Sequence, residues 1–321
     1  LGLVGVIAAG AYLSAEAGTV LAFLSFFTLI LNAMLGISKI FVTLSRGVAS
    51  AERIERVLET DERMEVADYP EGDAGYKIEF KDVNFSYNGV ENNLDGVSFK
   101  VQAGQTVGVI GGTGSGKSAL VNLITRFYDA EQGEVLIDGE NVKNYKLDDL
   151  RKKVGVVPQK AVLFSGTIAD NLRWGNENAS LDDMEKAVSI AQAKEFIDKL
   201  PEGFDTEIAQ GGRNLSGGQK QRLTIARALT GSPEILILDD SASALDFATD
   251  AALRKAIAQN TTNMTVIIVS QRATSIRYAD KIIVLDDGEA VGIGTHDKLM
   301  ESCDVYREIV LSQEKSAKEG A

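Results

Sequence analysis

The chain has a single cysteine and is poor in basic residues relative to acidic ones. Its 321 residues include 33 Lys and Arg against 46 Asp and Glu, a formal net charge of −13. The one cysteine, Cys303, excludes an internal disulfide and suits a reducing compartment; we expect a small packed residue in a C-terminal helix. A strongly acidic chain lacks the basic surface of a nucleic-acid groove, so we expect no nucleic-acid partner.

The chain also lacks an initial methionine and a basic segment before its first apolar run. Leu1 begins that run at once, which is not the pattern of a signal peptide. We therefore expect the chain to be the C-terminal part of a longer protein. Leu1–Leu13 is uncharged but too short to cross a bilayer alone, so we interpret it as the end of a truncated helix.

A second uncharged run, Ala17–Ser38, follows a polar break that contains Glu16. Its length of about 22 residues makes about 33 Å of helix, enough to cross a bilayer. The run is apolar on all sides, which favours a membrane span over a buried helix of a soluble core. Three polar residues inside it are expected to face other helices rather than lipid: Ser25, Thr28 and Asn32.

Basic residues follow this run on one side only: Lys39, Arg46, Arg53 and Arg56. By the positive-inside rule the downstream part should be cytoplasmic. Val48–Leu58 keeps a helical period, so the helix should continue beyond the membrane. Thr60–Gly75 is acidic and contains Pro70 and glycines, which predicts a linker.

From Tyr76 onward, strand-like and helical runs alternate, which is typical of an α/β fold. The predicted strands are Ile78–Phe85, Val97–Val101, Thr106–Ile110, Glu134–Ile137, Val154–Val157, Ile235–Asp239, Val266–Ser270 and Ile282–Leu285. A turn at Asn88–Gly89 follows the first strand, and residues 286–288 join two short strands as a hairpin. The Lys-, Glu- and Ala-rich segment after Ser312 should be a frayed end.

A glycine-rich loop stands between the predicted strand Thr106–Ile110 and a helical run, Ala119–Phe127. The loop reads Gly111, Gly112, Thr113, Gly114, Ser115, Gly116, Lys117, Ser118. In this setting the spacing predicts a phosphate site rather than a glycine-rich surface turn. Backbone N–H groups would point at a phosphate chain, and the helix start adds partial positive charge. Lys117 would reach the β- and γ-phosphates, and Ser118 would bind Mg²⁺.

Two later stretches add to this prediction. Leu215–Gln219 opens a helical run and, with Ser216, Gly217 and Gly218, offers N–H groups to an anion, although an ordinary helix cap has the same pattern. Ile235–Asp240 is an apolar strand that ends in carboxylates, and Asp239 would hold Mg²⁺ through water.

Together these stretches resemble the Walker A, signature and Walker B motifs of an ABC transporter nucleotide-binding domain, and 243–246 resembles its D-loop. The resemblance implies an α/β P-loop NTPase fold with an antiparallel β subdomain and a helical signature subdomain, preceded by transmembrane helices. The implied domains are 1–58, the end of the transmembrane domain; 59–75, a linker; 76–315, the nucleotide-binding domain; and 316–321, a tail.

The same resemblance implies ATP and Mg²⁺ as ligands. The nucleotide-binding residues would be Tyr87, which stacks on adenine, Gly111 to Ala119, Ser216, Gly217, Gly218, Gln219 and Asp246. Ser118, Gln159 and Asp239 would hold the metal, and Asp240, Gln271 and Gln159 would be catalytic. Ordinary alternatives are a half-buried strand tyrosine for Tyr87 and a surface residue for Gln159.

In exporters of this family each ATP site forms between two chains, so the resemblance implies a second half-transporter, a lipid bilayer and an unknown exported substrate as partners. It also implies a multi-pass protein of the plasma membrane with a cytoplasmic nucleotide-binding domain. ATP would close the two domains on each other, and their opening and closing would drive the membrane helices.

The sequence departs from the family pattern at two positions. Asp240 stands where hydrolytically competent members have Glu, and Gln271 stands where they have the switch histidine. The only histidine, His296, lies downstream and should be structural. Gln can donate a hydrogen bond to a γ-phosphate but cannot carry the charge of an imidazolium.

Three hypotheses follow. The first is the degenerate-site subunit of a bacterial heterodimeric multidrug exporter, an ATP hydrolase whose own site is slow and whose signature completes the site of its partner. The second is a homodimeric exporter with ordinary ATPase activity. The third is a regulatory ATP-binding subunit that never hydrolyses.

Overall fold

The structure, a computed structural model, describes residues 2–13, 16–59, 64, 66–70, 75–241, 245–260 and 263–319. The chain divides into two compact units, Leu1–Met64 and Glu65–Ala321. Much of the predicted linker 59–75 lies outside the described residues, as do residues 243 and 244 of the predicted D-loop and residues 320 and 321 of the predicted tail.

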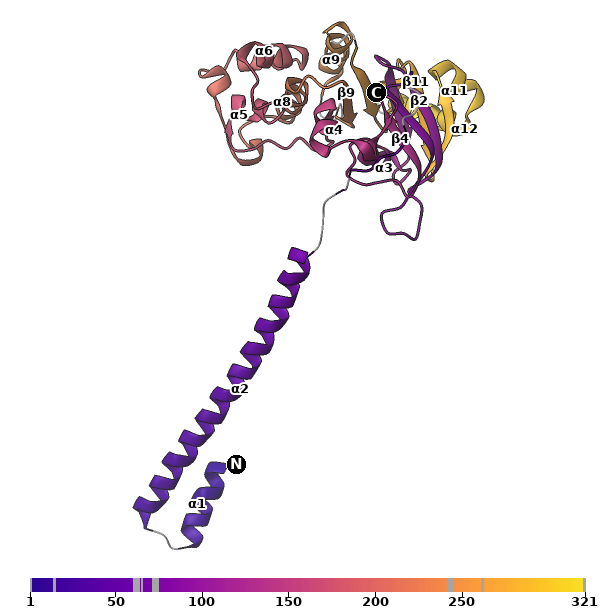
Figure 1. Cartoon of the computed structure of the whole chain (residues 1–321). Helices are drawn as coiled ribbons and strands as arrows, with labels where there is room; N and C mark the ends of the chain where they lie inside the picture. Colours follow the sequence, from indigo (N-terminus) through magenta and orange to yellow (C-terminus); the bar gives the residue numbers. More distant parts are fainter. Residues whose placement is uncertain are drawn as a thin grey trace. The chain divides into compact units, whose positions relative to one another are not determined.

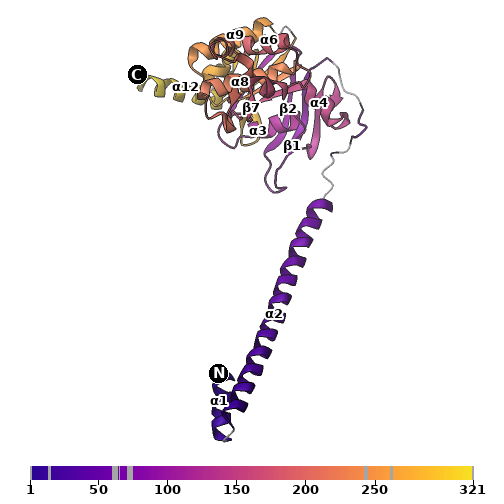
Figure 2. The ribbon, with the colours of Figure 1, turned by 90° about the vertical axis from the view of Figure 1, so that its left-hand side faces the viewer.

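The first unit consists of helices α1 (Gly2–Tyr12) and α2 (Ala17–Glu59), which lie side by side (Figures 1 and 2). Glycines on α1 permit the close approach: a Cβ on Gly10 would lie 2.6 Å from a methyl carbon of Val20. Within the described part of the chain, α2 is the one helix long and apolar enough to cross a membrane, with a mean hydropathy of 2.3 over its most apolar window.

The 43-residue α2 confirms that the helix continues without a break through Val48–Leu58. Hydroxyl groups on this helix bond to its own backbone. The hydroxyls of Ser25 and Thr28 donate to the carbonyls of Leu21 and Leu24 at 2.9 and 2.8 Å, one turn earlier in the same helix. Such back-bonding lets a hydroxyl sit in an apolar helix without an unpaired polar group.

The second unit is built on two sheets. An antiparallel sheet has the order β2-β1-β4-β5, with bounds Leu94–Val101, Ile78–Phe85, Gln132–Ile137 and Glu140–Asn141. A larger sheet has the order β12-β11-β3-β10-β9-β6, with bounds Glu289–Gly294, Lys281–Asp286, Thr106–Gly111, Thr265–Val269, Ile235–Asp239 and Val154–Val157. All its neighbours are parallel except the hairpin of β11 and β12. The described strands also include a short pair, β7 (Gly166–Thr167) and β8 (Glu207–Ile208).

Helices surround these sheets, and α5, α6 and α8 gather at one end of the unit, away from the antiparallel strands and from α11 and α12 (Figure 1). The helices are α3 (Lys117–Ile124), α4 (Leu147–Lys153), α5 (Ile168–Arg173), α6 (Leu181–Ile190), α7 (Lys194–Ile197), α8 (Gly217–Thr230), α9 (Phe247–Asn260), α10 (Ala273–Ile276), α11 (His296–Ser302) and α12 (Asp304–Glu319). The short 3₁₀ turns are Val142–Asn144, Gly203–Asp205 and Gln210–Gly212.

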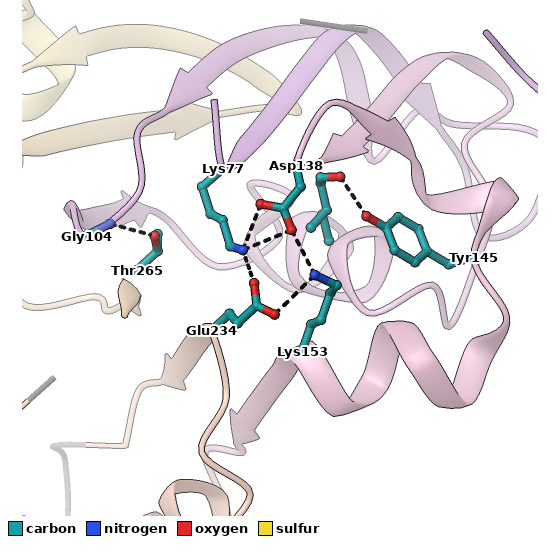
Figure 3. A network of polar contacts seen from close by, with 8 residues as sticks. Lys77, Gly104, Asp138, Tyr145, Lys153, Glu234 and Thr265 are labelled. Atoms are coloured by element: carbon teal, nitrogen blue, oxygen red, sulfur yellow. Dashed lines mark hydrogen bonds and ion pairs between the residues drawn. The ribbon is translucent and has the colours of Figure 1, made fainter. Parts of the chain in front are cut away.

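Four charged residues join the two sheets (Figure 3). Lys77, whose side chain is 8% exposed, pairs with Asp138 at 2.7 Å and also with Glu234, and Lys153 pairs with the same two carboxylates at 3.0 and 3.1 Å. Burial alone would raise the pKa of Asp138, but the lysines outweigh it and the pKa lies below its ordinary value. The hydrogen bond from Lys77 lowers the pKa of Glu234. This ion network fixes the antiparallel sheet against β6 and β9.

The structure corrects three predicted boundaries. The helix predicted for Ala119–Phe127 begins at Lys117 and ends at Ile124, because Arg126 has a left-handed backbone (φ 49°) that no helix continues. Strand β2 begins at Leu94 instead of Val97, since Leu94 pairs with Phe85. The chain after Ser312 is not frayed: α12 runs to Glu319, through residues with strong helix propensity.

Part of the predicted linker is attached to the second unit. The N–H of Ala67 donates to the carbonyl of Lys143 at 2.8 Å, and Tyr69 exchanges two hydrogen bonds with the side chain of Asn144. The sequence predicts Cys303 within a C-terminal helix; in the structure it is buried and caps the end of α11, between that helix and α12.

Candidate nucleotide-binding site

The site lies where parallel strands of the larger sheet end. Register places Val269 of β10 opposite Val109 of β3 on one side and Asp239 of β9 on the other, while Val157 of β6 lies opposite Leu238. The segments that follow these four strands therefore meet at one edge of the sheet. Ligands of open α/β sheets bind at this carboxyl edge.

The glycine-rich loop connects β3 to α3 at this edge, and its backbone requires glycine. Gly114 and Gly116 have φ values of 85° and 98°, a region that side chains avoid. A Cβ on Gly116 would lie 2.4 Å from the carbonyl oxygen of Asn93, and one on Gly111 would lie 2.2 Å from that of Leu285. Thr113 and Ser118 are exposed, and Ser115 and Ala119 are buried. The sequence thus forms a tight loop with its open side toward solvent.

Lys117 lies across this loop. Its ammonium donates to the carbonyl oxygens of Gly111, at 2.9 Å, and of Gly112, and to the Ser115 hydroxyl at 3.3 Å. Burial lowers its pKa, while the carboxylates of Asp239 and Asp240 act in the opposite direction. A cation is therefore held at the mouth of the loop, where the phosphates of a nucleotide would need it.

Asp239 is the last residue of β9, and Asp240 follows it. Their carboxylates carry the negative charge of the site. Burial raises the pKa of Asp239, Asp240 raises it further, and Lys117 opposes both. Asp240 has a left-handed backbone (φ 44°), and its Oδ2 accepts a hydrogen bond of 3.2 Å from Nε2 of Gln159. The structure thus brings Gln159, Asp239 and Asp240 together beside Lys117.

Tyr87 lies in an aromatic cluster after β1. Its ring packs edge-on against Phe85 at 4.8 Å and Tyr128 at 5.0 Å between centroids, and 44% of the residue is exposed. Burial raises the pKa of its hydroxyl, which accepts a hydrogen bond from Asn122 at 2.7 Å. One ring is therefore held in place and still open to a planar ligand.

The Tyr87 cluster and the glycine loop are connected by Asn93. Its side chain accepts a hydrogen bond from the N–H of Tyr87 at 3.0 Å, and its carbonyl is the group that excludes a side chain from Gly116. Neither Asn93 nor Asn122 belongs to a recognisable motif. The one available signal in the sequence is that Asn122 is polar among the otherwise apolar residues 119–124.

Gln271 is exposed directly after Ser270, at the end of β10, and thus at the same edge of the sheet. Asp246 lies at the start of α9, where its carboxylate accepts hydrogen bonds from the N–H and the hydroxyl of Thr249 at 2.9 and 2.8 Å. These bonds lower its pKa. The structure therefore gives Asp246 a local role as a helix cap.

The predicted signature stretch lies elsewhere, at the start of α8. Ser216 and Gln219 form a capping box: the Ser216 hydroxyl accepts from the N–H of Gln219 at 3.3 Å, and the Gln219 side chain accepts from the N–H of Ser216 at 2.8 Å. Gly217 and Gly218 form the first turn. Among the described residues no hydrogen bond or ion pair joins this stretch to the glycine loop of the same chain.

Known proteins share this order of motifs. The ABC transporter family matches residues 94–243, which include the glycine loop, the signature stretch and the end of β9. A solved bacterial Atm1-family ABC exporter with ATP bound is 34% identical, with a TM-score of 0.75 over 94% of this chain and 52% of that one. The second unit therefore has the fold of an ABC transporter nucleotide-binding domain, and residues 94–243 match that family.

The curated relatives of this chain are longer than it is. It is 44% identical to the uncharacterized ABC transporter ATP-binding protein YfiB of Bacillus subtilis over 94% of this chain and 52% of the relative. It is 40% identical to an ATP-dependent lipid A-core flippase of Haemophilus influenzae over 89% and 50%. The chain thus spans about half the length of the curated relatives it matches.

The residues of this ABC domain fit a magnesium-bound nucleotide. Ser118, Gln159 and Asp239 supply oxygen atoms, the ligands that Mg²⁺ prefers. Among the described residues no group of three or more His, Cys, Asp or Glu could hold a metal alone. Bound Mg²⁺ would neutralise part of the phosphate charge.

Proposed function

We propose that this chain is the ATP-binding end of an ABC exporter subunit that binds MgATP and works as half of a dimer in a membrane. The glycine loop, Lys117 and Asp239 would bind the phosphates and the metal, and Tyr87 would stack on adenine. ATP held between two such domains would close them on each other, and this movement would drive export of a substrate. The apolar helix α2 and the exporter relatives support this proposal.

We further propose that the chain's own site hydrolyses ATP slowly. The single observation that carries this proposal is the pair Asp240 and Gln271 beside an intact glycine loop. Asp240 has a carboxylate shorter than Glu by one methylene, and in the structure it is engaged by Gln159 at 3.2 Å. Gln271 cannot supply the charge of a protonated histidine. Both changes affect residues that would surround the attacking water.

The signature stretch carries no such change. The capping box of Ser216 and Gln219 keeps the first N–H groups of α8 ordered and directed out of the helix start. We propose that this helix start contacts the γ-phosphate bound by the loop of a second, different half-transporter. The heterodimer would then hydrolyse ATP mainly at the site that pairs the partner's loop with Ser216 of this chain.

The relatives differ in kind: one is a lipid A-core flippase and another belongs to the Atm1 family. We propose a plasma-membrane location with the ATP-binding domain in the cytoplasm, from the basic residues that follow the apolar part of α2.

The test uses the chain in lipid nanodiscs, alone and together with a candidate companion, a half-transporter that carries Glu and His at the positions of Asp240 and Gln271. Alone, it should bind ATP and release little phosphate. With the companion, hydrolysis should survive Lys117→Ala in this chain but not Ser216→Arg. Vigorous hydrolysis by the chain alone would favour a homodimeric exporter, and transport without hydrolysis at either site would favour a regulatory clamp. Both results would contradict the proposal.

A further inference from the structure

The C-terminal helix α12 is held firmly against the domain. Tyr306 is fully buried, and its hydroxyl lies 2.9 Å from Nδ1 of His296 on α11. Arg307 donates to the carbonyl oxygens of Met300 and Glu301 at 2.8 and 2.9 Å, so the end of α11 is tied to the start of α12. These contacts fix the position of α12 along its axis and its rotation about that axis. They therefore determine which side chains of its later turns face the domain.

Gln313 lies on the buried face of this helix. It follows Val310, which is 6% exposed, by three residues and Tyr306 by seven, and this spacing places all three side chains on one side of a helix. Its carboxamide makes two hydrogen bonds with the segment that follows β10. Nε2 donates to the carbonyl oxygen of Gln271 at 2.7 Å, and Oε1 accepts from the N–H of Ala273 at 2.9 Å.

The chemistry of the partners fixes the orientation of this carboxamide. A backbone carbonyl can only accept and a backbone N–H can only donate, so the amide must present its NH₂ to Gln271 and its oxygen to Ala273. The residue between them is also held, because the N–H of Arg272 donates to the Ser270 hydroxyl at 3.0 Å. The backbone that carries the Gln271 side chain is therefore fixed at three consecutive residues.

We infer that Gln313 is a positioning residue for Gln271. It acts through the backbone of residues 271–273 and sets where the Gln271 side chain stands at the sheet edge. The inference rests on the proposed function, in which Gln271 stands in place of the switch histidine, where its carboxamide would donate a hydrogen bond to the γ-phosphate. ATP has that phosphate and ADP lacks it, so losing Gln313 should reduce the preference for ATP over ADP.

A packing role for Gln313 would give a different result. Methionine has nearly the shape of glutamine without its donor and acceptor, so Gln313→Met keeps the packing and removes both hydrogen bonds. Gln313→Glu keeps the acceptor for Ala273 and removes the donor to Gln271. Glu308→Met changes an exposed residue of the same helix and serves as the matched control.

The experiment measures the Kd values of the full chain in nanodiscs for ATP and for ADP, with hydrogen exchange at the Ala273 amide. Gln313→Met should weaken ATP binding about 3- to 10-fold, the effect of one or two lost hydrogen bonds. ADP binding should not change. Exchange at Ala273 should accelerate in Gln313→Met and stay slow in Gln313→Glu, and Glu308→Met should match the unmodified chain in every measurement.

A double variant separates the inference from the proposed function. If Gln313 acts through Gln271, adding Gln313→Met to Gln271→Ala should cause no further loss of ATP preference. A further loss in the double variant would overturn the inference. So would a Gln313→Met variant that keeps the ATP preference of the unmodified chain while Gln271→Ala lowers that preference. An unchanged preference in Gln271→Ala itself would refute the proposed role of Gln271, and the inference with it.

Discussion

Replacing Asp240 by Glu should accelerate hydrolysis at the chain's own site. The added methylene extends the carboxylate by about 1.5 Å, and a general base must come within roughly 2.6–3.2 Å of the proton it removes. A misplacement of about 1 Å costs on the order of 100-fold in rate, so restored reach should raise turnover about 10- to 100-fold. The left-handed backbone at this position (φ 44°) favours Asp over Glu, so the gain in rate should come with a slight loss of stability.

The assay is single-turnover hydrolysis of ATP by the full chain in nanodiscs, with ATP affinity measured in parallel. Asp240→Gln has the length of the Glu variant without its charge and should be slower than the unmodified chain. An unchanged rate in Asp240→Glu, with ATP still bound, would refute the argument from carboxylate reach. It would indicate that Gln271 or the signature of the partner limits the reaction.

Three further predictions concern the stability and affinity of the ATP-binding domain. Lys77→Met should lower the free energy of unfolding by about 2 kcal/mol, because two carboxylates then share Lys153 alone. The pKa values of both carboxylates are lower in the folded chain than their ordinary values. The difference in unfolding free energy between Lys77→Met and the unmodified chain, measured by urea titration, should therefore be largest at pH 7 and shrink as pH falls below about 4. Tyr87→Ala should weaken ATP binding by about 1–3 kcal/mol, the usual value of base stacking. Tyr87→Phe keeps the ring and should bind ATP as tightly as the unmodified chain. Equal Kd values for the unmodified chain and both variants would show that Tyr87 does not contact the nucleotide. Gly116→Ala should destabilise the domain by about 2–3 kcal/mol, because its Cβ meets the Asn93 carbonyl at a φ of 98°. In a urea titration of both variants Gly112→Ala, whose Cβ would meet nothing within 4 Å, should change the free energy of unfolding little.

The sequence predicted the strands of the larger sheet and the residues at their ends well. Apolar runs bounded by glycines and carboxylates carry a strong local signal, so the positions of Lys117, Asp239 and Gln159 at one edge followed from motif order and strand direction. The two-residue strands β5, β7 and β8 could not be predicted, because their pairing depends on residues far away in the chain.

The contacts that support the site were also missed, for the same reason. Gln313 lies in a polar stretch that reads as a solvated end, and nothing in that stretch shows that its side chain reaches the backbone of Gln271, 42 residues earlier. Asn93 reads as a loop residue, although it lies against both Tyr87 and Gly116. Motifs identify residues that would contact a ligand, whereas the residues that hold them depend on tertiary packing.

The buried thiol of Cys303 has a practical consequence for spectroscopy. Its sulfur lies beneath β12, 3.9 Å from the carbonyl oxygen of Val291, where a maleimide or methanethiosulfonate reagent has little access. Spin labels or fluorophores attached through new surface cysteines would therefore report from their chosen positions with little background from this chain. The approach and separation of two such domains could then be followed by distance measurements during the ATP cycle without first removing a native residue.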